Sequence, residues 1–252
     1  MTQTVDQFTS SDAIQLAWRE VGEGRPLILL HGLFSDAQMN WIKFGHAERI
    51  AAQGFRVIMP DLRAHGLSGM PHEQVHYPQL VLVRDLNELI EHLEISDFDL
   101  GGFSLGARTV IEGVIGGLRP RRAILSGTGL GVLTNWDRRS KFYTDAIDKF
   151  DQVSRGDPHW FAIQFMKTMK VDREAARLLL GTMRDREDKH GLIDAFTMPT
   201  LVVCGAEDDD NGSAPELASI LPNAQYVEVP GTHMSSVTKP EFGDAIARYL
   251  GA

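Results

Sequence analysis

Short apolar runs and amphipathic stretches alternate along most of the chain. Residues 7–9 and 14–21 alternate between apolar and polar side chains around Ser10, Ser11 and Asp12, as the two strands of a hairpin do. Such alternation gives way to largely apolar runs, which are typical of parallel strands buried on both faces of a sheet. These runs lie at residues 26–30, 55–60, 98–103, 122–127 and 199–205.

Helical periodicity fills several of the intervals between these runs. Four leucines share one face of residues 78–94, with charged side chains opposite. Residues 224–230 alternate as a last strand, and an apolar helical face follows at residues 242–250. The chain is therefore predicted to form an α/β fold, in which helices flank a mostly parallel, twisted sheet of about eight strands.

The alternation of strands and helices stops in the middle of the chain, where only helical patterns occur. A first helix is predicted around Tyr143, which lies on its apolar face. A second helix is predicted to start at Asp157, and a third at Asp172. This change of pattern predicts two parts. They are an α/β core of residues 1–127 and 198–252 and an all-helical insertion of residues 128–197.

The run at residues 98–103 leads directly into a helical pattern, and Ser104 stands at the junction. The local sequence is Gly102-Phe103-Ser104-Leu105-Gly106. A serine on so tight a turn adopts a strained backbone conformation, and the two glycines leave room because they lack a Cβ. The hydroxyl is then exposed above the N-terminus of the following helix. A simpler alternative is a glycine-rich turn whose serine caps that helix.

This Gly-x-Ser-x-Gly junction resembles the nucleophile elbow of the α/β-hydrolases. The resemblance extends over essentially the whole chain apart from residues 128–197, which look like the helical cap that covers the site in that family. It implies an esterase-like serine hydrolase that needs no cofactor, with Ser104 as its nucleophile. A serine at this position argues against the dehalogenase and epoxide-hydrolase branches, which use an aspartate nucleophile.

The other members of a catalytic triad are expected after the last two strands. In the family that the chain resembles, the acid commonly stands three residues after the glycine that ends the strand, which is Asp208; Asp209 is the nearest competitor. The carboxylate of the triad acid holds the histidine in one tautomer and stabilises the imidazolium. His233 follows the final strand, and an imidazole with a pKa of about 6.5 is suited to take a proton from Ser104. The alternative is a solvent-exposed loop histidine.

Two backbone N–H groups are expected to stabilise the oxyanion, since loss of one such donor costs about 3 kcal/mol. In the family the first donor usually follows His-Gly, which is Leu33 here. Phe34 is the alternative, because the loop has only Gly32 where many lipases have several glycines. Leu105 would supply the second donor at the helix N-terminus. His31 is interpreted as structural.

Residues 61–68 look like the family's Asp-x-Arg-x-His-Gly-x-Ser stretch, with Ala64 where glycine is common. We expect Asp61, Arg63 and His65 to brace this loop through ion pairs rather than to take part in catalysis.

The insertion is rich in aromatic and methionine side chains, which suggests an apolar roof over the substrate. The same apolar stripes also fit the insertion's own core, so both interpretations stay open. The candidate pocket residues are Phe34, Trp136, Tyr143, Trp160 and Met234.

Composition limits the partners. The 252 residues contain 25 Lys and Arg and 34 Asp and Glu, a net charge of −9 with the two signs interspersed. This balance argues against nucleic acid or an anionic membrane surface as partner. The first residues lack a basic segment followed by an apolar stretch, and no uninterrupted apolar run of about 18 residues occurs. We expect a cytoplasmic protein that acts on a small molecule and is not inserted in a membrane; its oligomeric state is open.

No metal is expected, although acidic residues cluster after the run at 199–205. Aligning this cluster from Glu207 with a calcium-binding loop puts Ala218 where a bidentate glutamate is required. The single cysteine, Cys204, lies in an apolar run and is expected to be a core residue rather than a second nucleophile.

The expected reaction is hydrolysis of a carboxylic ester, lactone or thioester of a small, largely apolar acyl group through an acyl-enzyme. The same triad also serves carbon–carbon bond hydrolysis and cofactor-free perhydrolysis, and both stay open. An alternative of another class is a ligand receptor or binding module that keeps the fold without turnover. The leaving group and the acyl chain length stay open as well.

Overall fold

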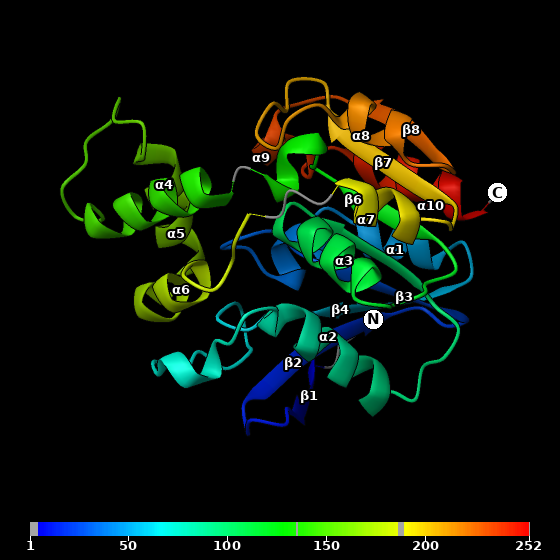
Figure 1. Cartoon of the computed structure of the whole chain (residues 1–252), viewed down its shortest axis with the longest axis horizontal. Coiled ribbons are helices and arrows are strands. Elements are labelled where there is room, and N and C mark those ends of the chain that lie inside the picture. Colours follow the sequence, from blue (N-terminus) through cyan, green and yellow to red (C-terminus); the bar gives the residue numbers. More distant parts are fainter. Residues whose placement is uncertain (1–4, 135, 186–188, 252) are drawn as a thin grey trace.

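The computed structural model describes residues 5–134, 136–185 and 189–251. Its strands form one eight-stranded sheet with the order β1-β2-β4-β3-β5-β6-β7-β8 (Figure 1). β2 pairs antiparallel with β1 and β4, and the remaining neighbours are parallel. The predicted α/β class is confirmed. The strands are β1 (Val5–Thr9), β2 (Gln15–Val21), β3 (Arg25–Leu30), β4 (Phe55–Pro60), β5 (Asp99–Phe103), β6 (Ala123–Ser126), β7 (Thr200–Gly205) and β8 (Ala224–Val229).

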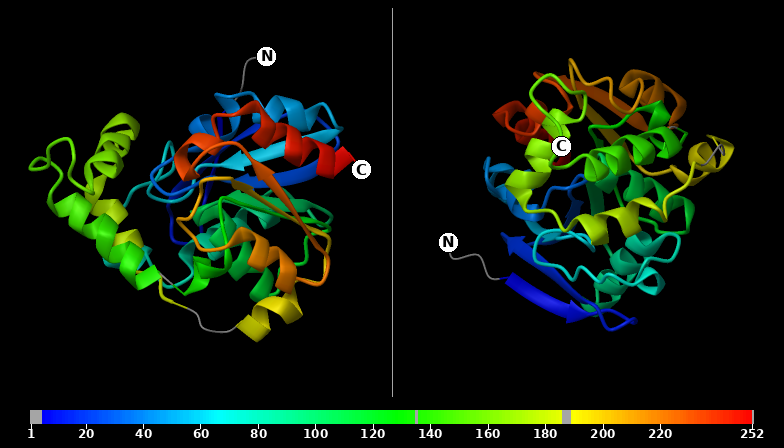
Figure 2. Two further views of the ribbon diagram at one scale, coloured as in Figure 1. Left: turned by 90° about the horizontal axis from the view of Figure 1, so that it is seen from above. Right: turned by 90° about the vertical axis from the view of Figure 1, so that its left-hand side faces the viewer.

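Helices cover both faces of the sheet, as the view along its edge shows (Figure 2, left). α1 (His46–Ala51) and α10 (Pro240–Gly251) lie on one face, and α2 (Val81–His92), α3 (Leu105–Ile115) and α8 (Ala214–Ile220) lie on the other. Successive side chains of β3 therefore enter different cores: Leu27 and Leu29 pack toward α10, whereas Ile28 and Leu30 pack toward α3. Burial on both faces explains why this strand is continuously apolar.

Helical segments occupy the described part of the chain between β6 and β7. Helices α4 to α6, called the cap helices below, project together from one end of the sheet, whereas α7 lies against α3 of the core (Figure 1). Their bounds are α4 (Trp136–Asp148), α5 (Trp160–Met169), α6 (Arg173–Leu180) and α7 (Lys189–Ala195). The division into a core and a cap at residues 128 and 197 stays a prediction.

The starts of the cap helices follow local hydrogen bonding. The carboxylate of Asp172 accepts hydrogen bonds from the N–H groups of Glu174 and Ala175 at 3.1 and 3.0 Å, so α6 begins there as predicted. Asp157 instead accepts from the N–H of His159, and the helix begins at Trp160, later than predicted. Short helical turns complete the structure: η1 (Gln38–Ile42), η2 (Gln74–His76), η3 (Leu130–Leu133) and α9 (His233–Ser236).

The turn between β5 and α3 has the predicted strained form. Ser104 has φ 54° and ψ −109°, a conformation that L-residues with a side chain rarely adopt. A Cβ on Gly102 would lie 2.3 Å from the carbonyl carbon of Gly106, and one on Gly106 would lie 2.3 Å from the carbonyl oxygen of Leu30. Both glycines are therefore required by close backbone approach.

Gly106→Ala is expected to lower the free energy of unfolding by at least about 2 kcal/mol, because the added Cβ meets fixed backbone rather than a movable side chain. Urea unfolding at neutral pH measures this. Gly181→Ala is the matched control, since a Cβ there meets only ordinary contacts from 3.4 Å outward and the residue has φ −69°. Equal stability of the two variants would contradict the packing at the elbow.

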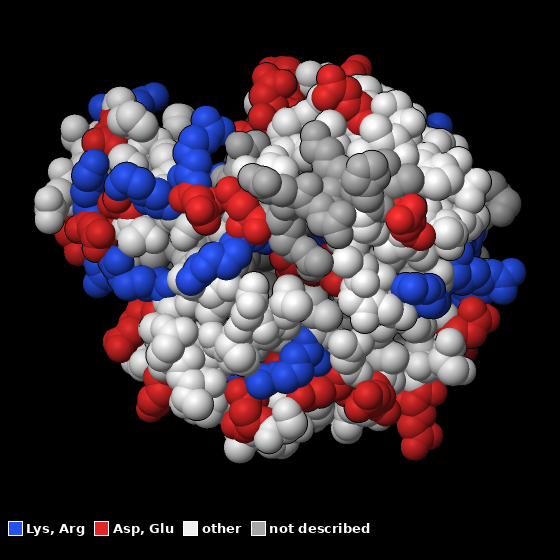
Figure 3. All heavy atoms as spheres, in the orientation of Figure 1, with Lys and Arg blue, Asp and Glu red and all other residues white. Residues whose placement is uncertain are grey.

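Acidic and basic side chains are intermixed on the face drawn in Figure 3, and neither sign gathers into a broad patch there. None of the helices in the described part of the chain is both long enough and apolar enough to cross a membrane.

Candidate active site

Three predicted residues from distant parts of the sequence meet above the ends of β5, β7 and β8. The Oγ of Ser104 lies 3.0 Å from Nε2 of His233, and Nδ1 of the same ring lies 2.9 Å from Oδ2 of Asp208. All three side chains are buried. The elbow positions Ser104, the loop after β7 positions Asp208, and the first residue of α9 is His233. This is the arrangement of a nucleophile, a base and an orienting acid.

The charge of Asp208 is stabilised by its neighbours. Burial alone would raise the pKa of this carboxyl, but hydrogen bonding and charge interaction with His233 outweigh burial and hold the pKa below its usual value. The carboxylate therefore accepts the Nδ1–H of His233, which leaves Nε2 free to accept the hydroxyl proton of Ser104.

The alternative acid, Asp209, is exposed, whereas Asp208 is buried and contacts Nδ1 of His233. Asp208 also accepts the N–H of Asp210 at 3.2 Å and the thiol of Cys204 at 3.4 Å. Cys204 is buried, as predicted, and burial raises the pKa of its thiol. Its contact with the acid of the site was not predicted, because the fold of the loop after β7, rather than the apolar pattern, brings the two side chains together.

A cation does not fit this group of residues. Asp208, Asp210 and His233 each offer one potential ligand atom, and these atoms lie within 4.8 Å of one another. Both ring nitrogens of His233 are, however, already engaged, one by Asp208 and the other by Ser104. We therefore assign no metal here.

The loop after β3 leaves the N–H group of Leu33 available. The N–H of Gly32 donates to Oδ1 of Asn40 at 3.1 Å, and the N–H of Phe34 donates to Nε2 of His65 at 2.9 Å. Ser35 donates its N–H to the carbonyl of Gly32 at 3.2 Å. Within the described residues no acceptor takes the N–H of Leu33, which lines the same cavity as Ser104. Phe34, the alternative donor, is therefore committed elsewhere.

Leu105 fits the second donor position through its backbone only. It is the first residue of α3, so its N–H has no acceptor within the helix. Leu105 also lines a different cavity, of about 330 Å³, between α2, α3 and the end of α6.

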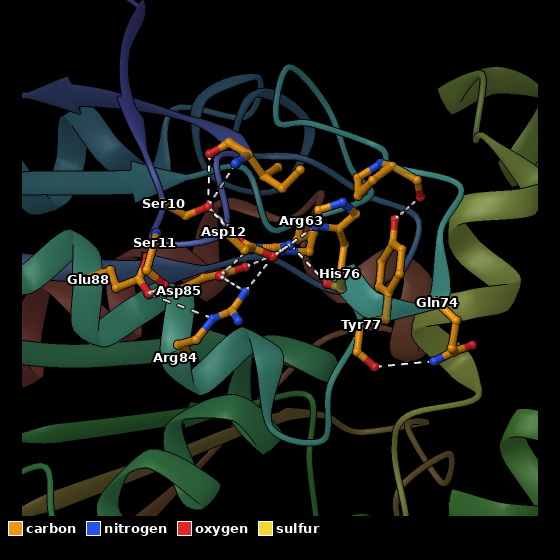
Figure 4. Close-up of polar contacts among 12 residues, drawn as sticks. Ser10, Ser11, Asp12, Arg63, Gln74, His76, Tyr77, Arg84, Asp85 and Glu88 are labelled. Carbon is orange, nitrogen blue, oxygen red and sulfur yellow. Dashed lines mark hydrogen bonds and ion pairs between the residues drawn. The ribbon is translucent and has the colours of Figure 1, made fainter.

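Asp61 and Arg63 brace the loop after β4 through ion pairs, as predicted, and their partners come from distant segments. The prediction was wrong for His65, whose ring contacts backbone groups instead. Arg63 is fully buried and forms paired hydrogen bonds to Asp85 on α2 and further bonds to Asp12 in the β1–β2 turn, at 2.7 to 2.9 Å (Figure 4). Asp61 pairs with Arg19 of β2 at 3.1 Å. This network fixes the loop from which His65 reaches Phe34.

His31 and His65 are buried and uncharged. Burial, opposed by the charge of Asp61, lowers the pKa of His31, and burial together with the neighbouring His31 lowers the pKa of His65 to about 3. Each ring accepts a backbone N–H through Nε2, which requires the neutral form. His31 is thus structural, as predicted.

These two histidines make stability depend on pH. Below about pH 6.5 the unfolded chain binds protons that the folded chain does not, so the free energy of unfolding falls as pH is lowered toward about 3. Urea unfolding between about pH 7.5 and about pH 5 measures the trend. Substitution of His72, an exposed ring whose pKa is raised by Asp172, should leave most of the trend in place. A pH-independent free energy over this interval would contradict the uncharged state of the pair.

A cavity of about 300 Å³ opens over Ser104 between the core and the cap helices. Three predicted pocket residues line it, namely Phe34, Tyr143 and Met234, and the ring of Tyr143 meets Phe34 edge-on at 5.3 Å between centroids. Further aromatic and apolar lining residues were not predicted. They are Met39, Phe44, Phe103, Phe142, Pro158, Phe161, Ala162, Phe165 and Val237.

Two predicted pocket residues lie outside this lining, so these assignments need correction. Trp136 is buried against the guanidinium of Arg108 on α3, with 5.0 Å between that group and the ring centroid. Trp160 packs edge-on against Phe161, and it is Phe161 that reaches the cavity. A helical stripe gives the spacing of such residues but not the face that meets the substrate.

Comparison with known proteins supports the fold. A family model described as the alpha/beta hydrolase fold matches residues 25–112, from β3 into the elbow helix. The chain has the α/β-hydrolase fold. This α/β-hydrolase is 26% identical to the non-heme chloroperoxidase CPO-A1 of Kitasatospora aureofaciens over 86% of its own length and 87% of that protein. It is 25% identical to the pyrrolizixenacetamide deacetylase of Xenorhabdus hominickii, over 87% of this chain and 88% of that protein.

Solved structures share the fold of this α/β-hydrolase along its whole length. An esterase from Exiguobacterium antarcticum superposes with a TM-score of 0.77 and 18% identity, over 98% of this chain and 99% of that one. At this level of identity the likeness concerns the fold alone.

Proposed function

We propose that this α/β-hydrolase is a serine hydrolase that cleaves uncharged carboxylic esters, lactones or thioesters of small apolar acids. The observation that carries the proposal is the hydrogen-bonded series Ser104–His233–Asp208 beneath an aromatic cavity. The relative from Xenorhabdus hominickii, whose name describes removal of an acetyl group, supports acyl transfer as the reaction class.

In the proposed mechanism Oγ of Ser104 attacks the carbonyl carbon while Nε2 of His233 takes the hydroxyl proton. The backbone N–H groups of Leu33 and Leu105 stabilise the oxyanion of the tetrahedral intermediate. Asp208 stabilises the imidazolium that forms, which then donates its proton to the leaving group. Water, deprotonated by His233, releases the acid from Ser104 and restores the free enzyme.

The charge of the cavity wall favours an uncharged substrate. Among the described lining residues there is no lysine or arginine, and the acidic lining residue is Asp210. A carboxylate on the acyl group would be placed among Phe34, Phe142 and Phe165 without a cationic partner, and desolvating an unpaired charge is costly.

A panel of p-nitrophenyl esters tests this proposal. Acetate, butyrate and benzoate esters are expected to be turned over with many cycles per active site, and the hemisuccinate ester at least about tenfold more slowly in kcat/KM because of its charge. Preference for the hemisuccinate would contradict the substrate class. A single stoichiometric turnover with all esters would favour a ligand-binding protein instead.

Perhydrolysis is a second candidate, and the relative named a non-heme chloroperoxidase favours it. In this reaction hydrogen peroxide replaces water in attack on the acyl-enzyme, so that a carboxylic acid and hydrogen peroxide give a peracid and water. Bromination of monochlorodimedone in acetate buffer with peroxide and bromide measures peracid. We expect the signal to require both acetate and Ser104; a signal without a carboxylic acid would contradict this route.

A further inference from the structure

The loops that follow β3 and β4 hold each other through two histidines. The Nε2 of His31, in the first loop, accepts the N–H of Leu62 in the second at 2.9 Å. The Nε2 of His65, in the second loop, accepts the N–H of Phe34 in the first, also at 2.9 Å. The rings meet edge-on with 5.1 Å between centroids. The two contacts are reciprocal, and both cross-link backbone to imidazole.

We propose that His65, with His31 as its counterpart, is a positioning residue that selects the N–H of Leu33 as the oxyanion donor by engaging the N–H of Phe34. The proposal rests on the proposed function, because the oxyanion is that of ester hydrolysis.

The hydrogen bonds of the first loop support this selection. The N–H groups on either side of Leu33 are both occupied, one by Asn40 and the other by His65. Phe34 also has φ 61°, a left-handed conformation that is unfavourable for a residue with a large side chain. The bond to His65 therefore holds the loop in a conformation that it would not keep by itself, and the neighbouring N–H of Leu33 stays without a protein acceptor.

The tautomer of each histidine is fixed by its second nitrogen. Nδ1–H of His31 donates to the carbonyl of Gly32 at 2.8 Å, and Nδ1–H of His65 donates to the carbonyl of Arg63 at 2.9 Å. With the proton on Nδ1, Nε2 is an acceptor, as both cross-links require. Burial favours the neutral form of both rings.

The buried arginine anchors this arrangement. Asp12 and Asp85 hold the side chain of Arg63 (Figure 4). The carbonyl of Arg63 is thereby fixed, and the ring of His65 is fixed through its hydrogen bond to that carbonyl. The oxyanion donor is thus tied to ion pairs between the β1–β2 turn, the loop after β4 and α2.

The tautomers can be measured without any variant. Nitrogen-15 NMR of histidine-labelled wild-type protein at neutral pH is expected to show Nδ1 protonated and Nε2 unprotonated for His31 and His65. A proton on Nε2 of His65, or a charged ring, would overturn the proposal, because neither form accepts the N–H of Phe34.

Two substitutions of His65 then test the link to catalysis. His65→Phe keeps a ring but removes the acceptor, whereas His65→Gln restores an acceptor near the Nε2 position. We expect His65→Phe to lower kcat for p-nitrophenyl butyrate by about 100-fold with KM nearly unchanged, and His65→Gln to recover most of the loss. Binding of a butyl trifluoromethyl ketone, whose adduct with Ser104 carries an oxyanion, should weaken by the same factor as kcat. His72→Gln, on the exposed surface, is the control.

Rates are expressed per active site, counted by complete labelling with a fluorophosphonate, so that loss of folded protein does not imitate the effect. A His65→Phe variant with wild-type kcat and ketone affinity overturns the positioning role alone. A wild-type protein that neither turns over esters nor binds the ketone overturns the proposed function and, with it, the oxyanion role of the loop.

Discussion

Ser104→Ala is expected to lower kcat for ester hydrolysis by about 10⁵-fold or more, since knocking out the nucleophile of a serine triad removes nearly all of its catalysis. The structural reason is direct: Oγ is the atom in contact with Nε2 of His233. Alanine keeps the Cβ, so the backbone at φ 54° and the glycine contacts of the elbow are unchanged. Initial rates with p-nitrophenyl butyrate measure the loss, and thermal unfolding should show an unchanged midpoint.

Ser126→Ala is the matched control for this substitution. Ser126 is also fully buried and lies on the neighbouring strand β6, but its hydroxyl has no hydrogen-bond partner among the described residues. Its activity is expected to stay within about twofold of wild type. Equal losses in both variants would indicate a general packing defect and would contradict the assignment of Ser104 as the nucleophile.

Asp208→Asn is expected to lower kcat by about 10⁴-fold, because an amide neither stabilises the imidazolium nor holds the proton on Nδ1 of His233. The side chain is buried and close in shape to aspartate, so folding should be preserved. The same ester assay measures the effect.

Asp209→Asn is the control for the acid, since Asp209 follows directly in sequence but is exposed. Its kcat is expected to stay within about twofold of wild type. If Asp209→Asn lost activity and Asp208→Asn kept it, the loop after β7 would have to take another conformation, and the acid assigned here would be wrong.

The features that the sequence could predict depend on local spacing and on close backbone contacts. The apolar run of β3 predicted a strand covered on both faces because Leu27 and Ile28 both need an apolar environment, and each has one on its own side of the sheet. The elbow could be predicted because Gly102 and Gly106 are the residues that the close approach of β3, β5 and α3 demands.

The rest depends on how distant segments meet. Spacing along α4 and α5 could not tell that Phe161 faces the cavity while Trp136 turns to Arg108, because a helical stripe fits a cap core and a pocket wall equally well. The contact of Cys204 with Asp208 and the cross-links of His31 and His65 arise from loop conformations that no periodicity records.

The most direct test of an activated nucleophile is the intact mass of the protein after treatment with a fluorophosphonate. We predict one adduct per chain in the wild type, no adduct in Ser104→Ala, and much slower labelling in His233→Ala, where Oγ has lost its base. An unlabelled wild type, under conditions that label a control esterase, or an adduct that persists in Ser104→Ala, would contradict the proposed serine hydrolase.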